Sequence, residues 1–350
     1  MVGLKILADE NIPDLEAACS EWGALRRLPG RAIDHAALGD SELLFVRSVT
    51  AVDHKLLQGS AVKFVASATI GVDHVDTQYL RSQGIGFAHA PGCNANAVVD
   101  YVMSIVLERY TDDEISKRHF GIVGYGNVGR RLARCLHHFN LSYSVYDPLI
   151  EQPPENRVDT LDKILCCDIV SLHVPLTHSG KHATEALLNS ARLKRLKPGA
   201  LLINSSRGPV VDNAALKRRL PLEPSLEAAL DVWQDEPAID TELAEKLLVA
   251  TPHIAGYSQQ GKLRGSVQIL RAAAAYFSLP LTAVPALPNS VTLDNISSMR
   301  DYRYQLSRCY SASIDSLRFC QAVSSERSIE ATFDNFRKNY PLRNEINYGE

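Results

Sequence analysis

Short apolar runs alternate with stretches of helical periodicity along most of the chain. The runs predict buried strands, because each is short, apolar and bounded by polar or turn-forming residues. The predicted strands are Leu4–Ala8, Leu43–Val46, Val62–Ala66, Ile85–Ala88, Phe120–Val123, Ser142–Tyr146, Ile169–His173, Ala200–Asn204, Leu226–Leu230 and a last one from Val249. Helices are predicted from Pro13 to Trp22, Ala97 to Tyr110, Gly129 to Phe139 and Gly261 to Phe277. Strands that alternate with helices form parallel sheets, so the predicted fold class is α/β.

Two interruptions of this pattern predict where domains meet. Pro91–Ala95 breaks the first series, and the helix from Ala97 leads into the second. The helix that starts at Gly261 returns toward the first domain, and Pro280–Pro288, with three prolines and no periodicity, predicts a linker. We therefore expect two parallel-sheet domains, Rossmann-like or flavodoxin-like, around a cleft. One comprises residues 1–96 with 257–282, and the other residues 97–256.

Gly124, Gly126 and Gly129 form a G-x-G-x-x-G motif between a predicted strand and a predicted helix. The first glycine permits a tight turn, the second lets the backbone approach a pyrophosphate, and the third lets helix and strand pack closely. The N–H groups at the start of the helix, next to Asn127 and Val128, then face a doubly negative ligand. In this strand–helix context the motif predicts a dinucleotide site.

Asp147 ends the next predicted strand, about 20 residues past the glycines. A carboxylate at this place accepts hydrogen bonds from a ribose diol and repels a 2′-phosphate. We therefore expect NAD rather than NADP as the cofactor. The alternative to a dinucleotide site is a glycine-rich turn in another kind of α/β protein.

The composition narrows the class of protein. The 350 residues are 45% hydrophobic and 22% charged, which is ordinary for a globular protein of two or three domains. The net charge of −3 gives no electrostatic reason to expect nucleic acid or an anionic membrane as a partner. No stretch approaches the ~20 apolar residues of a membrane span, and the N-terminus does not resemble a signal peptide. Seven cysteines without a C-x-x-C pair predict a cytoplasmic protein with no disulfide frame and no metal site.

Three polar residues, Arg207, Glu236 and His253, each follow a predicted strand of the dinucleotide sheet. Hydride transfer from an alcohol needs a base for the hydroxyl proton, and histidine suits this role because its pKa lies near neutrality. A carboxylate beside it would orient the ring, and the planar fork of an arginine binds a substrate carboxylate. Each residue alone also has an ordinary structural interpretation, but their shared place at strand ends favours a catalytic group.

Three sequence blocks carry a resemblance to a known family. Leu202–Asp212, Leu230–Pro237 and Thr251–Gly256 resemble the signature blocks of the D-isomer-specific 2-hydroxyacid dehydrogenases. The resemblance is dense over residues 4–280. Supporting stretches are Ile6–Pro13, Val46–Thr50, Gly71–Asp76, Pro91–Ala95, Ile254–Ser258 and Gly261–Gly265.

The resemblance implies NAD-dependent oxidation of a small phosphorylated sugar acid. By the family pattern His253 is the acid/base, Glu236 its partner, and Arg207 the anchor of the substrate carboxylate. Beyond the glycine motif, the residues implied in cofactor binding are Asp147, Val174, Ser205, Ser206, Arg207, Asp231 and Gly256. Those implied in substrate binding are Ser48, Thr69 and Tyr257, with Arg47 as a hypothesis for the phosphate. The resemblance also implies a small C-terminal α+β dimerisation domain at residues 283–350, and hence a homodimer.

Two alternatives remain open at this point. The first is another dehydrogenase of the same family, for example one that acts on phosphoglycerate. The second is a noncatalytic NAD-sensing protein, such as the corepressors that share this fold. Formation of NADH that depends on substrate would separate an enzyme from a sensor.

Overall fold

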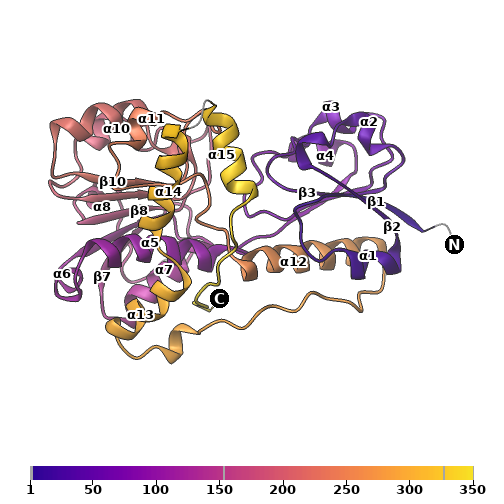
Figure 1. The fold of residues 1–350 in the computed structure, drawn as a ribbon. Coiled ribbons are helices and arrows are strands. Elements are labelled where there is room, and N and C mark those ends of the chain that lie inside the picture. Colours follow the sequence, from indigo (N-terminus) through magenta and orange to yellow (C-terminus); the bar gives the residue numbers. More distant parts are fainter. Residues whose placement is uncertain (1–2, 153, 326–327, 350) are drawn as a thin grey trace. The chain divides into compact units, whose positions relative to one another are not determined.

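The computed structural model describes residues 3–152, 154–325 and 328–349. Contacts divide the chain into two units. The first is the chain up to Asn94 together with Ser258–Asn289, and the second is Ala95–Tyr257 together with the chain from Ser290. Each unit is built on a parallel sheet covered by helices, so the predicted α/β class with two parallel sheets is confirmed (Figure 1).

Within the described residues, the sheet of the first unit has five strands in the order β2-β1-β3-β4-β5. The strands are β1 (Leu4–Asp9), β2 (Gly23–Leu28), β3 (Leu43–Val46), β4 (Phe64–Ser67) and β5 (Gly86–His89). The helices are α1 (Glu16–Trp22), α2 (His35–Leu38), α3 (His54–Leu57), α4 (Thr77–Ser82) and α12 (Gln259–Phe277), with a 3₁₀ turn η1 (Gly30–Ala32).

The pleat of these strands divides the core of the first unit into two layers. Ile6 and Phe45 pack with α1 and α12 on one face, and Leu7 and Leu44 belong to the cluster on the other. The sequence did not predict β2, which lies at the edge of the sheet and carries Arg26 and Arg27. An edge strand with charged residues has no apolar run by which periodicity could find it.

The sheet of the second unit has six strands within the described residues, in the order β11-β10-β9-β8-β6-β7. The strands are β6 (His119–Val123), β7 (Ser142–Tyr146), β8 (Ile169–Leu172), β9 (Leu201–Asn204), β10 (Glu227–Leu230) and β11 (Val249–Ala250). Up to Tyr257 its helices are α5 (Ala95–Arg109), α6 (Asp112–Ser116), α7 (Asn127–His138), α8 (Leu161–Leu165), α9 (Ser190–Leu193), α10 (Asn213–Arg219) and α11 (Thr241–Ala244), with 3₁₀ turns η2 (Gly208–Val210) and η3 (Leu220–Leu222).

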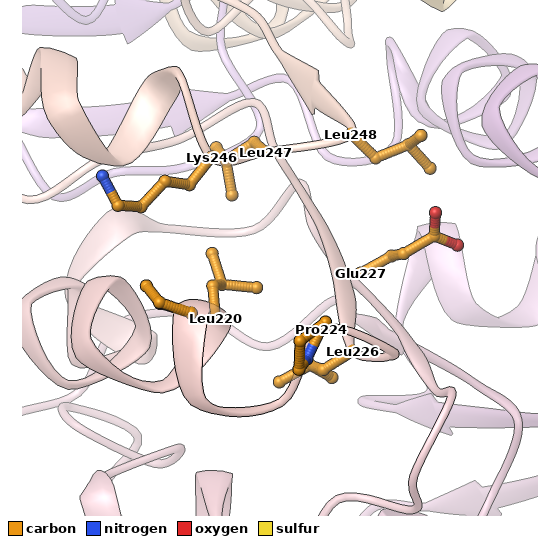
Figure 2. A pocket seen from close by; sticks show the side chains of 8 residues that line it. Leu220, Pro224, Leu226, Glu227, Lys246, Leu247 and Leu248 are labelled. Atoms are coloured by element: carbon orange, nitrogen blue, oxygen red, sulfur yellow. The ribbon is translucent and has the colours of Figure 1, made fainter.

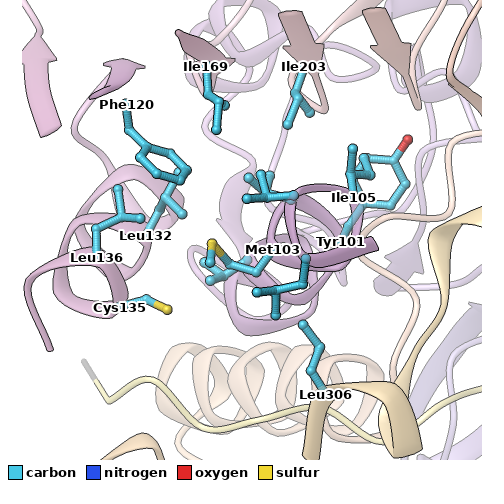
Figure 3. Packing of buried hydrophobic residues seen from close by; sticks show 14 of the residues in the cluster. Tyr101, Met103, Ile105, Phe120, Leu132, Cys135, Leu136, Ile169, Ile203 and Leu306 are labelled. Atoms are coloured by element: carbon cyan, nitrogen blue, oxygen red, sulfur yellow. The ribbon is translucent and has the colours of Figure 1, made fainter. Parts of the chain in front are cut away.

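Helix α5 forms the centre of one face of this sheet. Its residues 95–107 are all buried, because α7, the sheet and the C-terminal segment surround it. Figure 3 shows Tyr101, Met103 and Ile105 of α5 among Phe120 of β6 and Leu306 of the C-terminal segment. A mostly apolar helix that is buried on all sides is typical of such a central position.

The C-terminal segment contains helices that the sequence pattern did not reveal. They are α13 (Met299–Cys309), α14 (Ala312–Ser325) and α15 (Ile329–Lys338), preceded by a 3₁₀ turn η4 (Leu293–Asn295), and an isolated bridge pairs Thr292 with Asn347. Their apolar faces complete the core of the second unit, with Tyr302 and Tyr348 in one cluster and Phe319 and Phe333 in the other. Residues 290–350 therefore group with the second unit, whereas the sequence predicted a separate domain at 283–350. The dimerisation role of this segment stays a prediction.

Asp100 of α5 links the helix to the end of the chain and makes stability depend on pH. It is fully buried, and its carboxyl accepts hydrogen bonds from Tyr348 Oη (2.6 Å) and Ile346 N (3.1 Å). Burial raises the pKa of Asp100 to about 8, and the neighbouring Glu345 acts in the same direction. Because the unfolded carboxyl titrates near pH 4, this site stabilises the fold below about pH 4 and loses that contribution as the pH rises to about 8.

We expect Asp100→Asn to remove this pH dependence, since asparagine has the same shape and does not ionise. Between pH 6 and pH 8 the unfolding free energy of the wild type should fall by about 2 kcal/mol more than that of the variant. Urea unfolding at the two pH values measures both. Equal pH dependence in the two proteins would contradict the assignment.

Candidate active site

The predicted site residues of the second unit gather at the carboxyl ends of its strands. The glycine motif follows β6, Asp147 follows β7, Val174 follows β8, Ser205, Ser206 and Arg207 follow β9, Asp231 and Glu236 follow β10, and His253, Gly256 and Tyr257 follow β11. The register pairs Asn204 with Leu230 and Leu230 with Ala250, so β9, β10 and β11 end at the same level. Ligands of open parallel sheets bind at this edge.

The glycine loop has the geometry that its sequence predicts. A Cβ on Gly129 would lie 2.1 Å from Gly124 O, and one on Gly124 would lie 2.8 Å from the backbone of His173. A Cβ on Gly126 would meet nothing within 4 Å, so this glycine faces open space. Gly126 is the N-cap of α7 and offers no side chain to the first-turn N–H groups. The loop is therefore closed toward the sheet and open where a phosphate would approach.

Asp147 ties the glycine loop to the end of β7. Its Oδ2 accepts a hydrogen bond from Tyr125 N (2.8 Å), and its Oδ1 accepts one from Leu149 N (2.9 Å). Each carboxylate oxygen can accept a second hydrogen bond. The carboxylate is thus oriented by the backbone and retains acceptor capacity for a ribose diol.

His253 and Glu236 form a direct pair. His253 Nδ1 lies 2.7 Å from Glu236 Oε2, and Glu236 Oε1 accepts a hydrogen bond from Trp233 N at 2.8 Å. The His253 side chain is 33% exposed and that of Glu236 is 21% exposed. The imidazole is therefore oriented through Nδ1, which leaves Nε2 to exchange a proton with a substrate.

A buried carboxylate holds the loop that carries His253. Asp231 Oδ1 accepts hydrogen bonds from Thr251 Oγ1 (2.7 Å) and Ile254 N (2.8 Å), and Oδ2 accepts one from Ala255 N (2.9 Å). His253 N donates to Asp231 O at 2.7 Å, and His253 has the left-handed backbone conformation, φ +58°. A histidine in this conformation costs free energy, which these hydrogen bonds offset. The sequence assigned Asp231 to the cofactor, and the structure additionally gives it this positioning role.

The pKa values of Glu236 and Asp231 are shifted in opposite directions. Burial favours the neutral form of Glu236, but the charge of His253 and hydrogen bonds from His253 and Trp233 N outweigh it and lower the pKa of Glu236. At Asp231 burial prevails and raises the pKa, although His253 and the loop hydrogen bonds act in the opposite direction. Glu236 is thus the carboxylate that remains ionised next to the imidazole and can stabilise its protonated form.

Arg207 lies in a turn that two neighbours shape. Asn204 Nδ2 donates to Arg207 O at 3.0 Å, and Asn204 Oδ1 accepts from Ser206 N and Ser206 Oγ. A Cβ on Gly208 would lie 1.8 Å from Trp233 O, so the turn touches the backbone of the loop that carries Glu236. The sequence did not single out Asn204, although asparagine at a strand end before Ser-Ser-Arg is typical of such a side-chain-closed turn.

One buried hydroxyl at this sheet edge lacks a hydrogen-bond partner in the part of the chain that the structure describes. Ser205 Oγ is buried and has no hydrogen-bond partner within the described chain. It follows β9 at the same sheet edge as the open face of Gly126, and Val174 lies against Gly124. A dinucleotide along this edge fits these residues. Among the described residues, no cluster of three or more histidine, cysteine, aspartate or glutamate side chains is arranged to hold a metal ion.

The remaining predicted residues, Arg47, Ser48 and Thr69, belong to the first unit. Arg47 and Ser48 follow β3, and Thr69 follows β4 at the carboxyl edge of that sheet. Thr69 Oγ1 lies 2.6 Å from Ser67 Oγ, which lies 2.9 Å from His74 Nε2. The structure thus adds a Ser67–His74 pair behind Thr69, which sequence reasoning did not identify.

A hollow of about 480 Å³ lies away from this edge, beside the first residues of β10 and β11 (Figure 2). It is lined by Leu220, Pro221, Pro224, Leu226, Glu227, Lys246, Leu247 and Leu248. The carboxylate of Glu227 is paired with Arg109 at 2.7 Å. Because the hollow lies at the amino ends of parallel strands, it is distinct from the candidate active site.

Similarity to known proteins identifies first the class of dehydrogenase and then the family within it. Residues 100–255 match the family model described as "D-isomer specific 2-hydroxyacid dehydrogenase, NAD binding domain". The erythronate-4-phosphate dehydrogenase of Pseudomonas entomophila strain L48 is 44% identical over 352 residues, which cover 97% of this chain and 92% of that protein. The enzyme of the same name from Azotobacter vinelandii is 44% identical and covers 98% and 93%. The chain therefore belongs to the erythronate-4-phosphate dehydrogenase family, and the resemblance seen in the sequence is confirmed.

Solved structures support the fold. D-lactate dehydrogenase from Aquifex aeolicus, in complex with NAD and lactic acid, superimposes with a TM-score of 0.67 at 24% identity, over 78% of this chain and 96% of that one. NAD⁺-bound 3-phosphoglycerate dehydrogenase from Entamoeba histolytica gives a TM-score of 0.67 at 22% identity, over 83% and 99%. At this identity the likeness concerns the fold alone.

Proposed function

We propose that the protein oxidises 4-phospho-D-erythronate with NAD to (R)-3-hydroxy-2-oxo-4-phosphooxybutanoate and NADH, a reaction of pyridoxal 5′-phosphate biosynthesis. The observation that carries the proposal is the near full-length similarity to erythronate-4-phosphate dehydrogenases in a chain whose His253 and Glu236 are paired at 2.7 Å. The oriented imidazole supplies the base that oxidation of a hydroxyl requires.

In this proposal three side chains of the second unit perform the chemistry around the substrate. His253 accepts the proton of the 2-hydroxyl at Nε2, and Glu236 stabilises the imidazolium that results. Arg207 binds the substrate carboxylate with its planar fork and so orients C2. We assign Ser48, Thr69 and Tyr257 to substrate contacts, and Arg47 to the phosphate.

The cofactor site in this proposal is the edge formed by the glycine loop, Asp147 and Ser205. NAD, when bound there, supplies the hydride acceptor. The N–H groups at Asn127 and Val128 in the first turn of α7 face the pyrophosphate, and Gly126 leaves room for it. In this proposal Ser205 Oγ gains the partner that it lacks among the described residues.

We expect Asp147→Asn to weaken NAD binding by roughly 10- to 100-fold, because hydrogen bonds to a charged acceptor contribute about 1.5–3 kcal/mol. The change also removes the negative charge that repels a 2′-phosphate, so NADP should become a better substrate relative to NAD. Initial rates with each cofactor give both quantities, and Asp147→Ala is the companion variant. An unchanged NAD-to-NADP preference would exclude Asp147 from the ribose site.

One assay tests the reaction itself. Purified protein is mixed with NAD and 4-phosphoerythronate, and absorbance is followed at the NADH band. A higher kcat/KM for 3-phosphoglycerate would point to a different dehydrogenase. NAD binding without NADH formation from either acid would favour a sensor.

Two further properties belong to this proposal. The seven cysteines, all within the described ranges, are free thiols, which suits a reducing cytoplasm. No helix of the described residues is both long enough and apolar enough to span a membrane. We also propose a homodimer formed through the C-terminal segment, where Ile314 and Leu317 of α14 are exposed.

A further inference from the structure

The loop that carries His253 is held from two sides by groups far apart in the sequence. Asp231 accepts hydrogen bonds from its backbone N–H groups, as described above. Its carbonyl groups face the C-terminal segment and are bound by Arg343, which is 89 residues from Ile254. Neither the reaction nor the family blocks assign a role to Arg343.

Arg343 is held in this place by five polar contacts of its two terminal nitrogens. The two N–H groups of Nη1 are directed at Ile254 O (3.2 Å) and Tyr257 O (3.2 Å), and Tyr340 Oη lies 3.3 Å from the same nitrogen. Nη2 donates to Ala255 O (2.6 Å) and to Ala97 O of α5 (3.0 Å). A planar guanidinium carries its donors in fixed directions on separate nitrogens, which the single nitrogen of an ammonium does not, so the contact favours arginine over another positive charge.

The environment of Arg343 makes these contacts rigid. The residue is 8% exposed, and its Cζ lies 3.7 Å from the centre of the Tyr310 ring. Stacking on an aromatic face stabilises a desolvated guanidinium and restricts its rotation. The carbonyl groups that it binds therefore have little freedom to move.

The same segment also contacts the side chain of Tyr257. The Arg337 guanidinium of α15 lies 5.9 Å from the centre of the Tyr257 ring, and the Tyr340 ring packs edge-on against that ring at 6.0 Å. Arg337 adds to the positive potential that lowers the pKa of Glu236. The C-terminal segment thus reaches both ends of the loop from His253 to Tyr257.

We propose that Arg343 is a positioning residue of the dehydrogenase, which fixes the loop between His253 and Tyr257 by binding the carbonyl groups of residues 254, 255 and 257. This inference rests on the proposed function. The C-terminal segment then has a role in the active site of its own chain, separate from any contact with a second subunit. Displacement of a catalytic group by about 1 Å costs on the order of 100-fold in rate, so loosening this loop should affect turnover strongly.

The test compares Arg343→Met, Arg343→Lys and a matched control, Arg308→Met. Arg308 lies in the same segment, over the Tyr304 ring at 5.7 Å, but is exposed. We expect Arg343→Met to lower kcat by roughly 10- to 100-fold. Arg343→Lys should lie between it and the wild type, and Arg308→Met should match the wild type.

Two readouts separate positioning from a merely structural role. With 4-phosphoerythronate deuterated at C2, the isotope effect on kcat should rise in Arg343→Met, because the chemical step becomes slower. Hydrogen exchange of the peptide that spans residues 251–258 should be faster by about tenfold or more, since its backbone loses one of two anchors. A lower melting temperature with unchanged kcat and isotope effect would overturn the proposal.

The exchange measurement needs no substrate, so it also separates this proposal from the proposed function. If the wild type formed no NADH from 4-phosphoerythronate, the proposed reaction would be wrong. The role of Arg343 in fixing the loop would then be tested by comparing hydrogen exchange at residues 251–258 in the wild type and in Arg343→Met. If Arg343→Met did not fold, Arg343→Lys would decide, because it keeps the charge and loses the fork. A lysine variant with wild-type exchange, kcat and isotope effect would overturn the proposal.

Discussion

Replacing His253 by alanine is expected to lower kcat by about 10²–10⁴-fold, the range assigned to a positioned acid/base. The imidazole is held through Nδ1 by Glu236 at 2.7 Å and is 33% exposed, so its free nitrogen is available to the hydroxyl proton of a substrate. Steady-state rates of NADH formation with 4-phosphoerythronate give the effect.

The control for this substitution follows from the backbone. His253 has φ +58°, a conformation that asparagine tolerates better than alanine does. His253→Asn therefore removes the base with less strain than His253→Ala. If the imidazole acts in the reaction, both variants should lose activity to a similar degree. Near-normal turnover in His253→Asn would show that alanine acts through strain and that the assignment is wrong.

Arg207→Met is expected to lower kcat/KM for the acid by about 30- to 5,000-fold, which corresponds to the roughly 2–5 kcal/mol lost when one partner of a desolvated charge pair is truncated. Arg207 follows β9 at the same sheet level as the ends of β10 and β11, and Gly208 holds its turn against Trp233. If Arg207 contacts only the substrate carboxylate, the affinity for NAD, measured by fluorescence titration, should change little, whereas a share in the cofactor site, which the family resemblance also implies, would lower it.

Arg207→Lys is the matched variant for the second substitution. Lysine keeps the charge but loses the bidentate fork, so kcat/KM should fall between those of the wild type and Arg207→Met. Urea unfolding controls for the turn, since Arg207 Nη1 also donates to Ser206 O at 2.7 Å. Loss of NAD affinity in step with kcat/KM would assign Arg207 to the cofactor instead of the carboxylate.

Much of the candidate site could be predicted because its residues follow strands that are evident from local pattern. The run Ser142–Tyr146 was predicted with the bounds that the structure has, and Asp147 comes next in the chain. The same applies to Leu43–Val46, which precedes Arg47 and Ser48. Parallel topology then brings strand ends to one edge, so a residue's place after a strand is enough to propose its role.

The sequence by itself determined the two parallel sheets and the glycine loop, because these depend on periodicity and on short spacings, whereas the partnership of His253 with Glu236 was implied by the family resemblance. Only the tertiary structure decided how that histidine is held. The anchors of its loop are Asp231 and Arg343, and the second of these belongs to a segment whose helices have weak local signals and fold onto α5. Contacts between Arg343 and Ala97 join residues 246 positions apart, and no pattern within either stretch encodes such a partner. Burial of the segment's apolar faces brings the two together, which is a property of the folded chain as a whole.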